Sequence, residues 1–370
     1  MFMSILFNKM IIGIISPNNF VERGKIFMKK FMLISVFILL FAAPAFAFHG
    51  VRWELNASVT SSIAIDNGKL FFGDSIGDCY AVDKNSGSVL WTYNAGGSII
   101  GTPAVMSDKE EKVVFISSDG SIVCLSVYDG SLIWNYRTRE NRNEAVNDGT
   151  VAGNGMFFVV KDDGKLYALD SETGRTVWTY QGGDQGLRTA PAYSDGLIFL
   201  GEYDGVLNII DASTGKRVSG GGAGGAVNTP AANDGNVYFS SWDGSVQAFQ
   251  VKSVIPLGNT NVKDPVTTSP AVSGGLIAVG TGRGIVAVLD ENDGKILWKF
   301  DCKNGSVSSK PMIADGKVFA CSEGGNVYEL NASTGRLIDT FETDGIITNP
   351  DFSDGIFYFA AGGKVIALSE

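Results

Sequence analysis

One glycine recurs eight times along the chain at a nearly constant interval, and this repeat constrains the fold more than any other feature. The recurring residues are Gly77, Gly120, Gly164, Gly205, Gly244, Gly284, Gly325 and Gly363. Their mean spacing is about 41 residues, the length of one four-stranded blade of a β-propeller. The repeat therefore predicts eight structural units of one kind in a single domain.

Turn residues divide each unit into four strands. In the fourth unit, RTAPAY is followed by Asp195-Gly196, LIFLG leads to Gly205, and VLNIID runs into a turn from Asp211 to Gly215. Asp followed by Gly supplies the side-chain hydrogen bonds and the positive φ that such turns need. We therefore expect an all-β chain, an eight-bladed β-propeller of four-stranded antiparallel blades.

The two ends of the domain are expected to share one blade. The eighth unit, ITNPDFSDGIFYFAAGGKVIALSE (347–370), ends after three strands. Near the start of the domain, VRWELNA (51–57) matches the fourth-strand sequence VLWTYNA (89–95). This match predicts that the N-terminal strand joins the last blade, which closes the ring and removes an exposed strand edge.

Five tryptophans share one position in the fourth strand. They are Trp53, Trp91, Trp134, Trp178 and Trp298. Because they follow the structural period, we expect them to pack between neighbouring blades rather than to stack on a ligand. Ser219, Gly258 and Asp339 stand at this position in the other three units.

The N-terminal region has the pattern of an export signal. Residues 28–47 carry two lysines, an apolar stretch and the small-residue pattern Ala45-Phe46-Ala47, which predicts a signal peptide cleaved after Ala47. Residues 1–27 are interpreted as an untranslated region or an extended start of the signal. Residues 48–370 form the propeller, and no cysteine stands directly after the cleavage point to carry a lipid anchor, since the first is Cys79. We expect a periplasmic or secreted protein that is not a lipoprotein.

Charge and residue inventory exclude several functions. Residues 48–370 contain 24 basic and 38 acidic residues, a net charge of −14, so a nucleic-acid partner is not expected. No other apolar run in this region is long enough to span a membrane. Its only histidine is His49, which excludes a Ser-His-Asp triad and a multi-histidine metal site in the ring. Cys302 and Cys321 are expected at one rim of the ring, either as a disulfide or as free buried thiols.

Several arginines are predicted to gather at one rim of this acidic domain. The longest connection between blades, RTRENRNEAV (137–146), carries Arg137, Arg139 and Arg142. Arg188 and Arg283 belong to segments that open toward the same rim. This pattern fits either a solvated charged loop or a binding rim for an anionic group or an acidic protein surface.

The repeated unit seen as ALDSETGRTVW (168–178) resembles the pyrroloquinoline-quinone (PQQ) repeat family along essentially all of 51–370. The resemblance implies a propeller and two functional branches. Quinoprotein alcohol dehydrogenases carry PQQ, calcium, a catalytic Asp and a disulfide between adjacent cysteines, and this sequence has no Cys-Cys pair. The non-catalytic outer-membrane assembly factors of the BamB type bind protein partners, and Leu187-Arg188 resembles their partner-contact segment. Gly225-Ala226-Val227 stands where that group has acidic residues.

Together these features predict a non-catalytic, extracytoplasmic scaffold that binds a protein partner, with a role in outer-membrane protein assembly. We expect a monomer without a cofactor. A PQQ-dependent oxidoreductase with calcium and a cell-surface propeller that binds a ligand or glycan are the alternatives.

Overall fold

A computed structural model describes residues 50–107, 111–137, 146–161, 163–184, 186–187, 189–307, 309–345, 347 and 350–369. The predicted signal peptide and the segment before it lie outside these residues. The described residues form eight four-stranded antiparallel sheets and contain no helix. In particular, none of them belongs to a helix that could cross a membrane. The eight-bladed propeller expected from the repeat is confirmed.

The first four blades follow one another along the chain, each from its inner to its outer strand. Blade one contains β2 (Ala64–Asp66), β3 (Lys69–Gly73), β4 (Asp78–Asp83) and β5 (Val89–Asn94). Blade two contains β6 (Ile99–Met106), β7 (Lys112–Ser117), β8 (Ser121–Ser126) and β9 (Leu132–Arg137). Blade three contains β10 (Val146–Gly153), β11 (Met156–Lys161), β12 (Lys165–Asp170) and β13 (Thr176–Gln181). Blade four contains β14 (Ala192–Ser194), β15 (Leu197–Gly201), β16 (Val206–Asp211) and β17 (Arg217–Gly222).

The other four blades continue the same order. Blade five contains β18 (Ala231–Asn233), β19 (Asn236–Ser240), β20 (Ser245–Gln250) and β21 (Ile255–Asn261). Blade six contains β22 (Ala271–Ser273), β23 (Leu276–Gly280), β24 (Ile285–Asp290) and β25 (Ile296–Asp301). Blade seven contains β26 (Met312–Ala314), β27 (Lys317–Cys321), β28 (Asn326–Asn331) and β29 (Leu337–Glu342). Blade eight contains β30 (Asp351–Ser353), β31 (Ile356–Ala361), β32 (Lys364–Ser369) and β1 (Gly50–Asn56).

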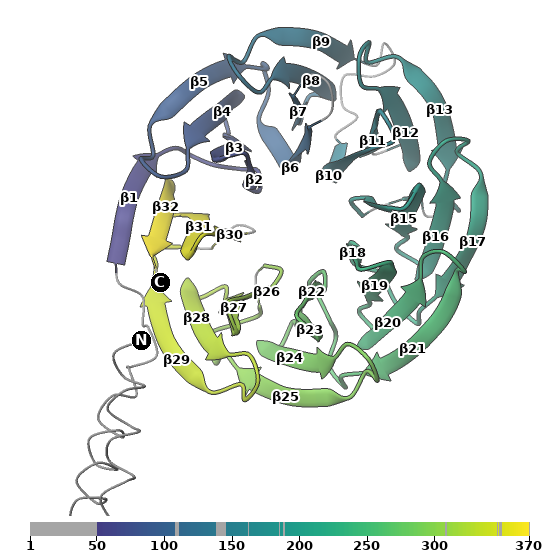
Figure 1. Ribbon diagram of the computed structural model, residues 1–370, viewed down its shortest axis with the longest axis vertical. Helices are drawn as coiled ribbons and strands as arrows, with labels where there is room; N and C mark the ends of the chain where they lie inside the picture. Colours follow the sequence, from purple (N-terminus) through teal and green to yellow (C-terminus); the bar gives the residue numbers. More distant parts are fainter. Residues whose placement is uncertain are drawn as a thin grey trace, which may run out of the picture. The chain divides into compact units, whose positions relative to one another are not determined.

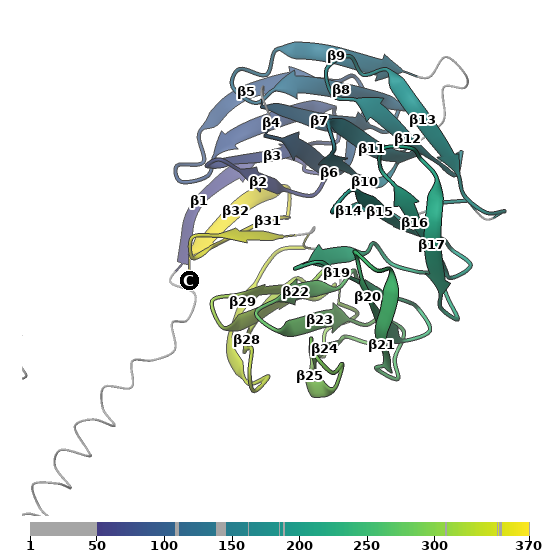
Figure 2. The ribbon, with the colours of Figure 1, turned by 45° about the vertical axis from the view of Figure 1, so that its right-hand side comes forward.

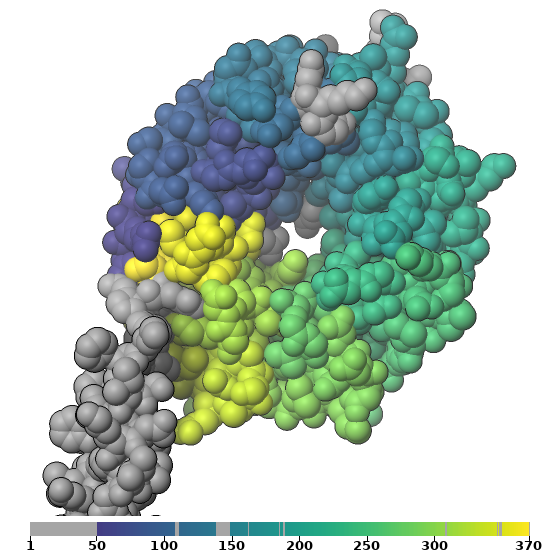
Figure 3. Space-filling model, in the orientation of Figure 1, coloured from purple at the N-terminus to yellow at the C-terminus, as the bar shows by residue number. Residues whose placement is uncertain are grey.

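The N-terminal strand closes the ring, as the sequence match predicts. β1 pairs antiparallel with β32, from Gly50 opposite Ser369 to Asn56 opposite Lys364. Figure 1 shows β1 as the outer strand of the last blade, with the inner strands around the centre of the ring. The oblique view shows the blades as neighbouring sheets (Figure 2), and the space-filling view leaves the centre of the ring open (Figure 3).

The hydrophobic core is divided among the junctions between blades. Eight clusters of buried side chains lie one at each junction, including the junction of blade eight with blade one. Each blade is a sheet with two apolar faces, and each face is covered by one of the two neighbouring blades. The stability of the ring therefore depends on contacts between neighbouring blades.

The five periodic tryptophans connect the blades in one common way. Each indole N–H donates to a backbone carbonyl in the next blade, in the turn between its third and fourth strands, at 2.8–3.1 Å. The acceptors are Lys84, Val127, Ser171, Ala212 and Ala332. Each ring lies against the glycine of the same turn, so these residues pack between blades as their spacing predicts.

The disulfide considered for Cys302 and Cys321 is not present. Both are buried free thiols, as are Cys79 and Cys124. Cys302 belongs to the cluster between blades six and seven, and Cys321 to the cluster between blades seven and eight. The two thiols therefore pack on opposite sides of blade seven. Burial raises the pKa of the Cys302 and Cys321 thiols to about 12, which disfavours the reactive thiolate.

Candidate partner-binding rim

One rim of the propeller combines the recurring glycine turns with the connections between blades. The turns join the second and third strands of each blade, and the connections return from the fourth strand to the next blade. The two are hydrogen-bonded to each other: Ala95 N donates to Gly77 O at 2.8 Å, and Ala223 N donates to Gly205 O at 2.9 Å. We call this side of the ring the glycine rim. The opposite rim carries the turns between third and fourth strands.

Acidic residues on the glycine rim serve the turns themselves. Asp119, Asp163, Asp204 and Asp243 each precede a recurring glycine and accept a backbone N–H two residues further on, at 2.8–3.3 Å. Partial burial raises the pKa of Asp119 and Asp243, but hydrogen bonds and, for Asp119, the charge of Arg137 outweigh it and hold both below the usual value. The hydrogen bonds of the four carboxylates stabilise the turns of this rim.

In blade six, Arg283 stands directly before the recurring glycine, in place of the aspartate that accepts a backbone N–H in the turns above. The Thr281 hydroxyl accepts the Ile285 N–H there at 3.0 Å. The guanidinium of Arg283 is largely exposed and lies 3.2 Å from a carboxylate oxygen of Asp264. The exposed Arg137, at the end of β9, pairs with Asp119 at 2.8 Å.

These two ion pairs correct the interpretation of a cationic rim as far as the structure describes it. Both described arginines are neutralised by neighbouring carboxylates, so they give the rim polarity without a net positive patch. Exposed pairs of this kind contribute little to stability, about 0–1 kcal/mol, and can exchange partners readily. Arg139, Arg142 and Arg188 lie outside the described residues.

Leu187 does not reach the surface of the rim. Its side chain has no exposed area and packs in the cluster between blades three and four. Leu187 forms a β-bridge with Glu202, a buried residue whose carboxylate accepts the Gly183 N–H at 3.1 and 3.2 Å and the Asn208 side-chain N–H at 2.5 Å. The prediction that Leu187 belongs to a partner-binding rim therefore remains a prediction, with the Leu187 side chain buried in this structure. Leu187 anchors the segment that precedes residue 188.

Three apolar side chains that the sequence analysis did not single out project from the rim. Ile76 is 69% exposed, Tyr203 60% and Trp242 51%. Tyr203 and Trp242 stand two residues before the recurring glycines of blades four and five, at the same place in successive turns. Trp242 is held by its backbone N–H, which donates to Ala226 O at 3.0 Å, and by its indole N–H, which lies 3.3 Å from Asn228 Oδ1.

A signal for this feature was present in the sequence. Trp242 is the one tryptophan that departs from the fourth-strand spacing. Large exposed aromatic side chains on fixed turns are the residues that most often anchor protein interfaces.

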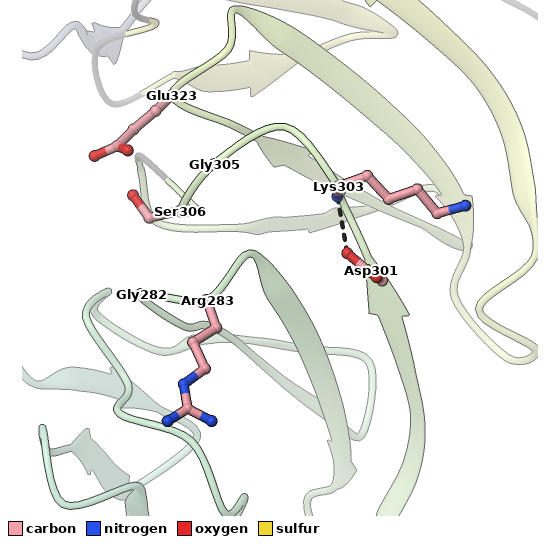
Figure 4. Close-up of a pocket in the computed structure, with 7 residues that line it drawn as sticks. All are labelled: Gly282, Arg283, Asp301, Lys303, Gly305, Ser306 and Glu323. Atoms are coloured by element: carbon pink, nitrogen blue, oxygen red, sulfur yellow. Dashed lines mark hydrogen bonds between the residues drawn. The ribbon is translucent and has the colours of Figure 1, made fainter.

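A shallow polar depression lies on the same rim between blades six and seven. Its volume is about 560 Å³, and Figure 4 shows its walls. Arg283 belongs to blade six, Glu323 to blade seven, Asp301 to the end of β25, and Lys303 to the connection that follows, with its side chain directed away from Arg283 and Glu323 (Figure 4). Lys303 N–H donates to Asp301 Oδ1 at 2.8 Å. The alternation of both charge signs suits a polar protein surface better than a simple anion.

The described residues can be compared with the side-chain cluster that a calcium site would need. Calcium needs several converging oxygen ligands, and no three acidic, histidine or cysteine side chains of the described part of the chain come together in this way. The four cysteines are buried and lie apart in sequence.

Comparison with known proteins agrees with this geometry. A family model described as outer membrane protein assembly factor BamB matches residues 49–253 and 243–369. An assembly factor BamB of Shewanella oneidensis is 24% identical over 284 residues, which cover 73% of this chain and 71% of that protein. The crystal structure of BamB from Moraxella catarrhalis superposes with a TM-score of 0.73 at 20% identity, covering 86% of this chain and 97% of that one.

A quinoprotein shares the fold over part of its length. The quinohemoprotein alcohol dehydrogenase of Comamonas testosteroni is 30% identical over 150 residues, which cover 35% of this chain and 21% of that protein. The fold, the repeat and the rim thus define an eight-bladed propeller of the PQQ-repeat class. Within that class, the match to both halves of the ring shows that the chain belongs to the outer membrane protein assembly factor BamB family.

Proposed function

We propose that this protein is a non-catalytic, extracytoplasmic scaffold that takes part in outer-membrane protein assembly and binds a protein partner through its glycine rim. The role in assembly follows from the family, whose model covers nearly the whole ring. The observation that carries the choice of surface is the pair of aromatic side chains, Tyr203 and Trp242, exposed on successive turns of blades four and five. The repeat does not need them there, because it buries its own tryptophans between blades.

The geometry favours binding rather than catalysis on this rim. The acidic residues of the turns are engaged by backbone N–H groups, and the described arginines are paired with Asp119 and Asp264. A rim that carries both exposed aromatic side chains and paired charges has the kinds of residue found at protein interfaces.

Site-specific photocrosslinking in cells tests the proposal. Tyr203 and Trp242 are each replaced by p-benzoylphenylalanine, and Tyr128, 67% exposed in a turn of the opposite rim, is the matched control. We expect crosslinks to an outer-membrane assembly component from positions 203 and 242 and none from position 128. Equal crosslinking from position 128, or crosslinks only to unrelated proteins, would contradict the proposed surface.

We also propose that the protein acts without PQQ. The family match over the ring supports this, since the sequence similarity to quinone-dependent alcohol dehydrogenases covers 35% and 46% of the chain in two such relatives. Titration of the purified protein with PQQ and Ca²⁺ provides the test, read by calorimetry and by dye-linked dehydrogenase activity. Stoichiometric binding together with activity would instead establish the oxidoreductase alternative.

A further inference from the structure

Gly258 stands where five other blades have a tryptophan. In β21, Gly258 pairs with Ala248 of β20, next to a register shift. Trp91 pairs with Ala81, Trp134 with Cys124 and Trp178 with Ala168, each next to the same kind of shift. The backbone pairing at Gly258 is therefore the same as at the tryptophan positions of the other blades, but the residue has no side chain.

A cavity is found beside this position, between blades five and six. Its volume is about 180 Å³, and residues of β20, β21 and the turn between β24 and β25 line it. Figure 1 shows β21 next to that turn. Val246, Ile277 and Leu289 form its apolar wall, and all three are buried. Ile277 and Leu289 are the equivalents, counted from the recurring glycine, of Val113 and Leu125, which share a cluster with Trp91. The cavity, which we call the slot, therefore lies at the tryptophan position of this junction, and polar residues, among them Gln247, Asn259 and Asp293, line it together with the apolar wall.

The hydrogen-bond acceptor of the slot is also in place. At the five junctions that contain a tryptophan, the indole N–H donates to the backbone carbonyl of the residue seven positions after the recurring glycine of the next blade. Trp91, for example, donates to Val127 O. The equivalent residue in blade six is Glu291, which lines the cavity. Among the described residues, no N–H or O–H group donates to the backbone carbonyl oxygen of Glu291. An indole entering the slot finds the same acceptor that the five tryptophans use.

Other contacts hold the walls apart. The Thr260 hydroxyl donates to Gly294 O at 2.7 Å, and Tyr238 OH donates to Glu291 Oε1 at 2.6 Å. Both bonds cross from blade five to the turn of blade six, so the junction keeps its spacing without an indole. Gly258 itself is exposed, and a Cβ added there would meet no atom within 4 Å, so the slot opens to solvent.

The junction at Ser219 shows what happens when a slot is filled by other means. There the Phe249 ring packs against the outer strand of blade four, and a Cβ on Gly221 would lie 2.9 Å from it. No such ring enters the slot at Gly258. The Thr260 side chain lies against Gly294, where the other junctions place an indole ring, and the cavity beside it between blades five and six is not filled by an aromatic ring of the described residues.

We propose that this slot is a binding site for an indole group, presented by a small molecule or by a tryptophan side chain of a partner. Blades five and six supply the apolar wall, and Glu291 O accepts the indole N–H. An apolar cavity of about 150 Å³ in another protein is large enough to bind benzene, so the volume here suits an aromatic ring system. This site is independent of the glycine rim and of the function proposed for it.

Direct titration of the purified protein with indole tests the proposal, read by ligand-observed NMR and by calorimetry. We expect saturable binding at millimolar indole to the wild-type protein. Gly258→Trp should fill the slot with the chain's own indole, weaken indole binding at least tenfold and raise the Tm by about 1–4 °C, as cavity-filling changes do. Gly258→Ala is the matched control and should bind indole within twofold of wild type, because the added methyl group meets no neighbour.

Two further ligands identify the chemistry and its source. N-methylindole lacks the donor and should bind about two- to tenfold more weakly, the usual effect of one hydrogen bond. Binding of N-acetyltryptophanamide as well as indole would indicate a partner's side chain, and binding of indole alone a small molecule. The proposal is overturned if wild-type protein shows no saturable binding, or if Gly258→Trp and wild type bind indole equally. If Gly258→Trp does not fold, Gly258→Leu serves as the filling variant.

Discussion

Replacement of Trp134 by alanine tests whether the periodic tryptophans hold the ring together. Trp134 is 7% exposed, its N–H donates to Ser171 O at 2.9 Å, and its ring meets Phe157 edge-on with centroids 6.1 Å apart. Burial of a tryptophan removes about 150–250 Å² from water, worth about 4–6 kcal/mol at roughly 25 cal/mol per Å². Because neighbouring side chains relax into part of the space, we expect a loss of about 3–5 kcal/mol in the free energy of unfolding.

Two further variants divide this effect into its parts. Trp134→Phe keeps an aromatic ring but loses the hydrogen bond to Ser171, and should cost about 1–2 kcal/mol. Trp242→Ala removes an exposed tryptophan and should change stability by less than about 0.5 kcal/mol. The measurement is guanidinium denaturation followed by circular dichroism at pH 7. If Trp134→Ala cost no more than Trp242→Ala, the role of the fourth-strand tryptophans between blades would be refuted.

Three other changes probe the turns and the closure of the ring. Gly174→Ala places a methyl group 2.6 Å from the Trp134 ring at a φ of +66°. It should lower the Tm more than the control Gly155→Ala, where φ is +70° but the added methyl group meets no atom within 4 Å. Equal effects on the Tm would mean that backbone strain alone matters. Deletion of 50–56 exposes the edge of β32 and should lower the Tm of the whole ring and promote association, measured by light scattering; an unchanged Tm would argue against closure as a source of stability. Hydrogen bonds from Ser213 and Thr214 hold the pKa of Asp211 below its usual value, so its stabilising effect is present above the unfolded pKa of about 3.9 and disappears as the pH falls below it. Asp211→Asn should therefore flatten the fall of Tm between about pH 5 and pH 3, and an unaltered slope would show that this turn does not contribute.

Most of the fold could be predicted because it is repeated in the sequence. The period of the recurring glycines gave the number of blades, and the likeness of 51–57 to 89–95 gave the strand that closes the ring, now seen as β1 paired with β32. A turn or a strand depends mainly on residues close together in the chain, and eight copies of one pattern reinforce each prediction. The family resemblance rested on the same repeat.

The candidate rim was predicted only in outline. The sequence placed Arg137 and Arg283 on one side of the ring, but their pairing with Asp119 and Asp264 depends on how separate turns and connections meet in space. The burial of Leu187 and the exposure of Trp242 depend on the same packing. A side chain named correctly by resemblance can therefore have a different exposure from the one expected.

The sequence by itself determined the class of fold, the ring closure and the positions of the tryptophans that join the blades, because these follow from local patterns repeated at a fixed period. Only the tertiary structure decided what fills the space between blades where the repeat lacks its tryptophan. Ser219 and Gly258 are both departures at the tryptophan position, yet Phe249 packs at the first junction and a cavity remains at the second. That difference arises from side chains of neighbouring blades, which are brought together only when the ring is closed.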